Sequence, residues 1–407
     1  MTDSAISGVV NNTEISIPPI WLIRILVWGQ RFFQPVIKPK KLPLKFPTIN
    51  IGILENPYPG TLLFTNANNP FLSNIERFNS HIAEIDKYTG KILLYRRILT
   101  KAYLFQSQPD GYSYGILEKI GVNGGGHSGT HYLCDRNLKV INSFRIVDLP
   151  ESTTDLHEFL LLENGNVLLL SYQSRKIDLS SIGGDKEALV YDPVIIEQTS
   201  SGEITWFWHG KQHFDLNDIF NSTNSPDVDI NAIAPLHVDY AHANALGFFP
   251  DGNILLSLKY MNCLIKIDRQ TKDIIWCIGG SKCLKNQFTF VNDPNNGFSN
   301  QHSARILPNN NLLLFDNGTL HSQKESRAVE YEIDEQNFTA RLIWSYSNNQ
   351  YTPAQGSVER LPNGNTLIGW GFATKPFVSE ITPQGTVALE MSLPKGQMVY
   401  RVCQSKK

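Results

Sequence analysis

Three histidines occupy similar places in this chain and could together form one reactive site. His157, His242 and His302 each lie eight to ten residues before the centre of a turn, and a short apolar segment follows each turn. Near neutral pH an imidazole is a competent nucleophile, and an imidazolium is a proton donor. Three such rings in one cavity could transfer a group through a covalent intermediate, or they could hold a zinc ion.

The zinc interpretation has the weaker support. The chain contains no HExxH or HxH pattern, and Glu158 directly follows His157, so in a regular strand it would point to the opposite face. We therefore expect no catalytic metal, while a structural ion in the ring stays an open alternative. Each histidine alone could be a core residue bonded to a backbone carbonyl, but three at equivalent places favour a site.

The elements that would position these histidines form a repeat. A hairpin with a turn of two to five residues and a second strand rich in β-branched and aromatic residues recurs at 81–96, 130–145, 193–208, 262–277, 328–346 and 377–393. Between these hairpins, a turn followed by a very apolar strand recurs at 163–172, 250–259, 308–317 and 362–371. This spacing predicts an all-β fold, a six-bladed β-propeller of four-stranded antiparallel blades.

The repeat also predicts how the chain is organised. Segment 60–67 is expected to close the ring by pairing with the C-terminal blade, so the propeller would span about 50–403. We therefore divide the chain into a short N-terminal extension, 1–48, and a propeller domain, 49–407. Equivalent positions in successive blades face the common axis, so the three imidazoles should converge at one mouth of the channel. The insert 211–235, which lacks a strand pattern, is expected to cap one mouth.

The composition excludes several classes of function. Of 407 residues, 36 are basic and 38 acidic, which gives a net charge of −2, and no basic run carries interleaved aromatic residues. Nucleic acid is therefore not an expected partner. The five cysteines include no CxxC; Cys277 and Cys283 could form a small disulfide, but two reduced thiols are the favoured interpretation.

The N-terminal segment gives no standard export signal. Residues 1–16 are polar and lack a basic region, so we expect a cytoplasmic protein. The apolar stretch 17–28 has twelve residues and contains Arg24, so it is too short to span a bilayer. We favour a short helix packed on the domain, while peripheral membrane contact through 17–33 is the alternative. The sequence does not predict an oligomeric state.

Several motifs together resemble the arylsulfotransferase family. The strongest matches are DLHEF at 155–159, DYAHANAL at 239–246, KIDRQTKDIIWCIGG at 266–280, QHSARILP at 301–308, FDNG at 315–318 and ERLPNGNTLIGWG at 359–371. The resemblance covers roughly residues 55–390. It implies a six-bladed propeller that moves a sulfuryl group from an aryl sulfate ester to a phenolic acceptor, without PAPS or another cofactor.

The resemblance also implies roles for particular residues. His302 would be the nucleophile that forms a sulfohistidine in a ping-pong reaction. His157 and His242 would support it, and Asn244 corresponds to the asparagine of the family's HxN pattern. These three histidines are the catalytic residues that we expect.

Two positions depart from the family pattern. We expect substrate contacts from Asn244, Lys259 and Arg305, but Lys259 stands where the family has an arginine, and Ala245 stands where it has a serine. A lysine keeps the charge and loses the planar two-pronged donor of arginine. A related propeller that performs another transfer, an alkylation or a cyclisation on an aromatic small molecule is therefore an open alternative, as is a non-catalytic binding propeller.

Overall fold

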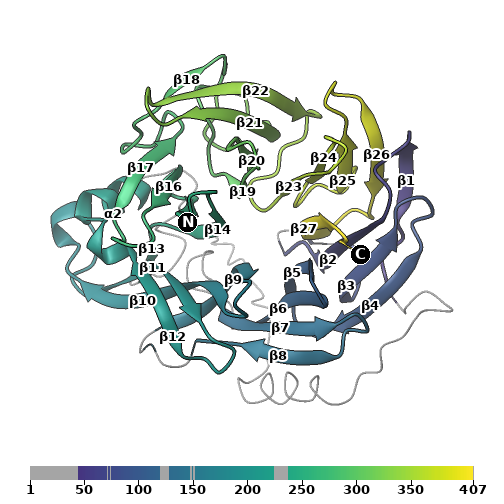
Figure 1. The fold of residues 1–407 in the computed structure, drawn as a ribbon, viewed down its shortest axis with the longest axis horizontal. Helices are drawn as coiled ribbons and strands as arrows, with labels where there is room; N and C mark the ends of the chain where they lie inside the picture. The colour runs from purple at the N-terminus through teal and green to yellow at the C-terminus, as the bar shows by residue number, and fades with distance from the viewer. Residues whose placement is uncertain are drawn as a thin grey trace, which may run out of the picture. The chain divides into compact units, whose positions relative to one another are not determined.

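The computed structural model describes residues 45–406, except 71, 74, 120–127, 147–148, 150–151 and 224–236. In these residues six small antiparallel sheets follow one another around a central axis (Figure 1). The predicted all-β six-bladed propeller is confirmed. Residues 1–44 of the N-terminal extension, with the possible membrane contact at 17–33, lie outside the described residues, and the domain boundary at 48 stays a prediction.

Each blade has four core strands, and its innermost strand lines the axis. Blade 1 contains β2 (Thr61–Asn68), β3 (Ser80–Asp86), β4 (Ile92–Ile98) and the C-terminal β27 (Gln397–Gln404). Blade 2 contains β5 (Ala102–Gln108), β6 (Gly111–Lys119), β7 (Ser128–Asp135) and β8 (Val140–Phe144). Blade 3 contains β9 (Ser152–Leu161), β10 (Val167–Ile177), β11 (Ala188–Gln198) and β12 (Ile204–His209), with β13 (His237–Asp239) parallel to β11.

The remaining three blades complete the ring. Blade 4 contains β14 (Ala243–Phe248), β15 (Ile254–Leu258), β16 (Cys263–Ile267) and β17 (Ile274–Gly279). Blade 5 contains β19 (His302–Ile306), β20 (Leu312–Asp316), β21 (Arg327–Asp334) and β22 (Thr339–Ser347), with β18 (Thr289–Val291) parallel to β22. Blade 6 contains β23 (Ser357–Arg360), β24 (Thr366–Gly369), β25 (Val378–Ile381) and β26 (Val387–Ser392), with β1 (Asn50–Leu54) outside β26.

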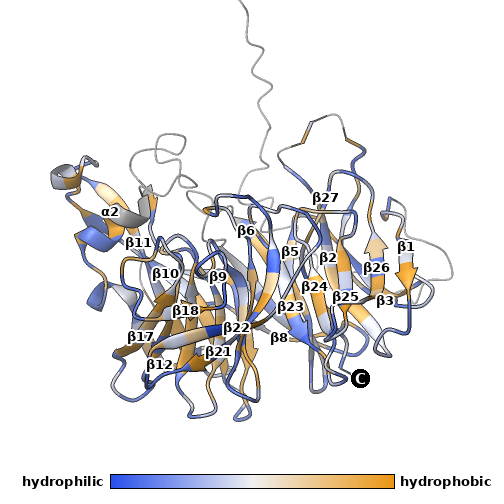
Figure 2. Cartoon of the chain, turned by 90° about the horizontal axis from the view of Figure 1, so that it is seen from above, coloured by the Kyte–Doolittle hydropathy of each residue, from blue (hydrophilic) through white to orange (hydrophobic). Residues whose placement is uncertain are grey.

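The two repeated sequence units correspond to different parts of a blade. The six predicted hairpins are the two outer strands of the six blades, and each apolar unit is the second strand from the axis. Every residue of β15 and β20 is buried, because neighbouring blades cover both faces of these strands. The outer strand β22 instead alternates along most of its length between partly buried and exposed residues. Apolar residues accordingly follow the strands, and hydrophilic residues gather in the loops (Figure 2).

The two ends of the propeller are joined in different blades. β27 pairs with β2 from Leu62 opposite Gln404 to Asn68 opposite Gln397. The segment 60–67 does close the ring with the C-terminal part of the chain, but the C-terminal strand joins blade 1 as its innermost strand. β1 pairs with β26 at the outer edge of blade 6. Each terminal strand thus links the beginning of the propeller to its end.

The insert that the sequence predicts over one mouth contains helical structure. It includes the short 3-10 helix η3 (Gly210–Gln212) and α2 (Leu216–Thr223), and a second 3-10 helix, η2 (Ser180–Ile182), lies in blade 3. Because residues 224–236 lie outside the described part, the capping role stays a prediction. In the part of the chain that the structure describes, no helix is long and apolar enough to cross a bilayer.

A buried ion pair joins blades 1 and 6 where the ring closes. Lys87 Nζ lies 2.8 Å from Glu380 Oε2, and both side chains are fully buried. The Lys87 ammonium also donates to the carbonyl of Tyr58 at 3.0 Å, and Glu380 accepts from Asn365 Nδ2 at 2.8 Å. Burial lowers the pKa of Lys87, while the Glu380 charge opposes this change. Removing either partner would leave the other charge buried without compensation.

We expect Lys87→Met to lower the free energy of unfolding by about 3–5 kcal/mol, because Glu380 then stays buried without a cation. Thermal unfolding followed by circular dichroism measures the effect as a lower midpoint. Lys176→Met is the matched control, since Lys176 pairs with Glu187 on the surface, where both side chains are 69% exposed. Equal midpoints for Lys87→Met and the wild type would contradict the role of this pair.

Candidate active site

The three histidines lie together at the propeller axis. The ring centroids of His157 and His242 are 5.0 Å apart, and those of His157 and His302 are 6.3 Å apart. His157 belongs to β9, His242 immediately precedes β14, and His302 is the first residue of β19, so three innermost strands contribute. All three side chains are buried, with exposures between 2% and 5%. We expected these three rings to converge because they occupy equivalent places in the repeat, and the structure does bring them together.

Bulges in the innermost strands aim these side chains. In β19 the pairing shifts between His302 and Arg305, and Ser303 between them adopts a positive φ of 54°. His242 itself has a φ of 47°. β9 and β27 carry bulges at 155–158 and 400–401. A bulge interrupts the alternation of a strand, and such bulges recur beside active sites, where they turn a side chain toward a cavity.

The bulge in β9 contains His157 and Glu158, and both side chains reach partners on other innermost strands. The His157 ring contacts the ring of His302 on β19, while Glu158 Oε2 lies 2.9 Å from Arg305 Nη1 and 2.9 Å from Arg401 Nη1. The side chains of residues 155–158 do not alternate regularly between the two faces of the sheet, because all four residues lie opposite a single residue of β10.

His302 has the protonation state that a nucleophile needs. Its Nδ1 lies 2.6 Å from the carbonyl oxygen of Gly356, and a carbonyl only accepts, so we assign the proton to Nδ1 and the lone pair to Nε2. Burial, the Arg401 charge and the His157 charge hold the pKa of His302 well below its usual value. The ring is therefore neutral at physiological pH, and Nε2 can attack an electrophile.

His157 is held by a carboxylate. Its Nδ1 lies 2.8 Å from Asp155 Oδ1, and the same oxygen accepts the backbone N–H of His157 at 2.7 Å. Asp155 thereby fixes the plane of the ring and directs Nε2 away from itself. Its negative charge also offsets the positive charge that the ring acquires when it takes up a proton. The pair resembles the histidine–carboxylate pairs of acid–base catalysis.

His242 lies beside a second buried carboxylate. Asp239 Oδ1 accepts the backbone N–H of His242 at 2.8 Å, and Asp239 Oδ2 lies 3.6 Å from His242 Nδ1. Burial, together with the nearby charge of Asp155, raises the pKa of Asp239 to about 7. Asp239 therefore lies beside the His242 ring as a buried carboxyl group whose proton affinity is increased.

Two further residues of the site come from β27, and the sequence interpretation did not identify them. The Tyr400 ring lies 5.4 Å from that of His302 and 6.0 Å from that of His157. Burial raises the pKa of Tyr400, so its hydroxyl stays protonated. Arg401 is 4% exposed and donates to the carbonyl of Asn244 at 2.7 Å. The predicted closure of the ring could have identified these two residues, because the C-terminal strand that closes the ring also lines the axis.

Two of the expected substrate-binding residues lie beside the histidines. Asn244 Nδ2 donates to the carbonyl of Gln301 at 2.8 Å, so this amide holds the residue that precedes His302. The Lys259 backbone N–H donates to the carbonyl of His242 at 3.1 Å, and its ammonium lies 5.1 Å from the centre of the Tyr260 ring. The charge of Lys259 also contributes to the low pKa of His302. Both residues therefore act on the histidine cluster.

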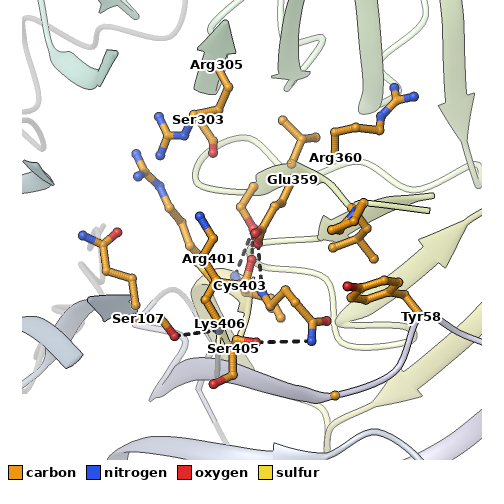
Figure 3. A pocket seen from close by; sticks show the side chains of 18 of the residues that line it. Tyr58, Ser107, Ser303, Arg305, Glu359, Arg360, Arg401, Cys403, Ser405 and Lys406 are labelled. Carbon is orange, nitrogen blue, oxygen red and sulfur yellow. Dashed lines mark hydrogen bonds between the residues drawn. The ribbon is translucent and has the colours of Figure 1, made fainter. Parts of the chain in front are cut away.

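Arg305, in contrast, faces a separate cavity. This cavity has a volume of about 770 Å³ and is lined by Ser303, Arg305, Arg360, Arg401 and Lys406, among others, but by none of the three histidines (Figure 3). Arg305 and Arg401 extend side by side in this view, and both contact Glu158. The structure therefore places Arg305 in an ion network next to the histidine cluster rather than within it.

Comparison with known proteins agrees with this geometry. The family model of Arylsulfotransferase (ASST) matches residues 139–401, which is well over half of the chain and includes all three histidines. The chain belongs to the arylsulfotransferase family. The predicted resemblance is thereby confirmed.

Individual relatives match over shorter stretches. Arylsulfate sulfotransferase AssT of Escherichia coli O6:H1 (strain CFT073) is 29% identical over 168 residues, which covers 33% of this chain and 28% of that protein. AssT of Lelliottia amnigena is 31% identical over 113 residues, which covers 25% of this chain and 18% of that protein. Each match therefore spans less than a third of the relative's length.

A solved structure supports the fold alone. The crystal structure of a protein of unknown function from Bacteroides caccae has a TM-score of 0.52 and 14% identity to this arylsulfotransferase-family chain. The match covers 86% of this chain and 100% of that one.

We expect Arg401→Met to raise the pKa of His302, because the Arg401 charge disfavours protonation of the ring. A pH titration of ¹³C-labelled histidine by NMR measures the change, with His302 assigned by comparison with His302→Ala. Arg401→Lys keeps the charge and should leave the pKa closer to the wild-type value. Arg341→Met is the control, since Arg341 is 51% exposed on β22. If Arg401→Met and Arg341→Met gave the same titration, the electrostatic role of Arg401 would be wrong.

Proposed function

We propose that this protein transfers a sulfuryl group from an aryl sulfate ester to a phenolic acceptor, with His302 as the covalent nucleophile. The observation that carries the proposal is the hydrogen bond from His302 Nδ1 to the carbonyl of Gly356. Because this hydrogen bond uses the proton on Nδ1, the Nε2 lone pair of the buried, neutral ring is free to attack the sulfur. Membership of the family indicates the class of reaction.

In the first half-reaction, the Nε2 lone pair attacks the sulfur of the donor. A nitrogen–sulfur bond forms, and the sulfur–oxygen bond to the aryl group breaks, with its electron pair leaving on the phenolate oxygen. His157 or His242, when protonated, gives a proton to that oxygen. Asp155, at 2.8 Å from the His157 ring, and Asp239, beside His242, stabilise the cationic form that serves as this acid.

In the second half-reaction, the acceptor phenol reverses these steps. The same histidine takes the proton of the acceptor hydroxyl, and the phenolate oxygen attacks the sulfur of sulfohistidine. The nitrogen–sulfur bond then breaks, and its electron pair returns to His302 Nε2. Because the pKa of His302 lies far below neutrality, protonation does not compete with the next cycle.

The sulfuryl oxygens carry negative charge throughout, and fixed cations stabilise them. Lys259 is the cation that we assign to this role. Arg401 uses Nη1 for Glu158 and Nη2 for the carbonyl of Asn244, so it acts on the site mainly through its charge. We propose no PAPS and no other cofactor, since the donor itself brings the sulfuryl group. Cytoplasmic location and contact with a membrane surface stay proposals.

We expect His302→Ala to abolish turnover of p-nitrophenyl sulfate, because the variant lacks the Nε2 lone pair that attacks the sulfur. In the wild type, rapid mixing without an acceptor should release a burst of p-nitrophenol of at most one equivalent per chain. Mass spectrometry should then locate a sulfuryl group on the peptide that contains His302. His213→Ala is the control, since His213 stacks on Trp208 away from the site.

The opposite results would point to other functions. Full activity in His302→Ala would exclude this residue as the nucleophile. An active wild type without a burst would favour a direct transfer, and a wild type that neither reacts nor becomes labelled would favour a binding propeller.

We expect Lys259→Met to lower kcat/KM for the aryl sulfate by roughly 10²-fold, the usual effect of removing one donor to a developing anion. Lys259→Arg keeps the charge and adds a planar pair of donors, so it should retain most of the activity. Steady-state kinetics with p-nitrophenyl sulfate distinguish the two variants. Equal losses in both would indicate that Lys259 acts through packing on Tyr260 and not through its charge.

A further inference from the structure

Three cysteines that the reaction does not use form a compact cluster in blade 4. Cys263 begins β16, Cys277 lies in β17, and Cys283 follows in the turn after β17. The Sγ atoms of Cys277 and Cys283 are 3.7 Å apart, and all three sulfurs lie within 4.8 Å of one another. Three sulfurs placed trigonally around a metal ion at about 2.3 Å lie about 4 Å apart. The cluster therefore already has nearly the dimensions of a metal–thiolate site.

The local backbone explains how the three thiols meet. Cys263 pairs with Gly279 in the sheet, and Cys277, two residues before Gly279, projects from the same face. The turn then brings Cys283 back over Gly279, where an added Cβ would lie 2.4 Å from Cys283 Cβ. A glycine at 279 is thus required for the close approach of Cys283.

The Cys283 sulfur also has backbone donors. It accepts the N–H groups of Lys285 and Asn286, and it lies in hydrogen-bond contact with the Cys277 sulfur. Backbone N–H donors to sulfur are a common feature around metal-bound thiolates, where they stabilise the ligand charge. The positive charge of Lys285 also acts on Cys277.

The surroundings favour a site with three ligands. The exposures of Cys263, Cys277 and Cys283 are 1%, 5% and 9%, and the cluster lies in the apolar core between blades 3 and 4. Within the described residues, no histidine or carboxylate joins the three sulfurs as a fourth ligand. Structural zinc almost always has four protein ligands, whereas Cu(I) is the soft ion that thiolates select in sulfur-only surroundings.

We propose that Cys263, Cys277 and Cys283 form a three-thiolate binding site for Cu(I). Each thiol that binds as a thiolate loses its proton to solvent, and the ion keeps its oxidation state, so no oxidant or reductant is needed. The site lies outside the sulfuryl-transfer machinery and does not depend on the proposed reaction.

The site would nevertheless be coupled to the nucleophile through one side chain. Gln301 Nε2 donates to the carbonyl of Cys263 at 2.8 Å and to Ser257 Oγ at 3.0 Å, and Gln301 immediately precedes His302. An ion that fixes Cys263 would also fix the carbonyl that holds Gln301. Occupancy of the site should therefore stabilise the segment that presents His302.

The test is an anaerobic titration of the reduced full chain with Cu(I), with bicinchoninate as the competing chelator. We expect one Cu(I) per chain, with sulfur-only coordination by X-ray absorption. Cys263→Ser, Cys277→Ser and Cys283→Ser should each weaken binding by more than about tenfold. Cys134→Ser and Cys403→Ser are matched controls, since these two cysteines lie outside the cluster, and both should bind Cu(I) as the wild type does.

Three results would overturn the proposal. The first is the absence of stoichiometric Cu(I) binding in the reduced wild type. The second is unchanged affinity in Cys263→Ser, which would leave a two-thiol site. The third is a Cys277–Cys283 disulfide in protein alkylated at the moment of cell lysis. Circular dichroism shows whether each variant folds. Cys283 is the most exposed of the three cysteines, so Cys283→Ser is the variant best suited to test binding if the other two do not fold.

Discussion

The buried carboxylate of Glu158 holds the centre of the propeller together. It pairs with Arg305 from β19 and Arg401 from β27, and Arg401 in turn donates to the carbonyl of Asn244 in β14. Four innermost strands therefore meet through one acidic group. Two arginines hold the pKa of Glu158 below its usual value in spite of burial, so it stays ionised. A neutral residue here would leave two cations at the axis without a counter-charge.

This network also sets the chemistry of the histidines. Burial lowers the pKa of His302, and the positive charge that Arg401 places close to the ring lowers it further. Asp155 and Asp239 place carboxyl groups beside the other two imidazoles. The site thus combines one neutral ring with two rings that each lie beside a buried carboxyl group. A nucleophile and its acid partners require this difference, although all three are the same residue type.

The architecture could be predicted from the sequence because it arises from local patterns of residues. The hairpins and apolar strands recur with a period that fits blades, and the positions of the three histidines in that period place them at the axis. The bulge in β9 was not predicted, because a four-residue bulge has no local signature in the sequence. Tyr400 and Arg401 were missed because they reach the site through ring closure, a contact between residues more than 240 positions apart. Arg305 lies on β19, as His302 does, but it follows the bulge that turns His302 toward the axis. Its side chain therefore pairs with Glu158 and does not join the histidine cluster.

The closing strand has a consequence for how the protein is made. β27 follows the other strands of the propeller in sequence, and it supplies the residues that place charge and aromatic surface next to His302. Before β27 docks on β2, a nascent chain contains all three histidines, but Tyr400 and Arg401 are not yet in place beside them. A reactive imidazole is therefore tuned only after the whole ring has been synthesised and closed, so an incomplete or prematurely released polypeptide carries the nucleophile without the environment that activates it.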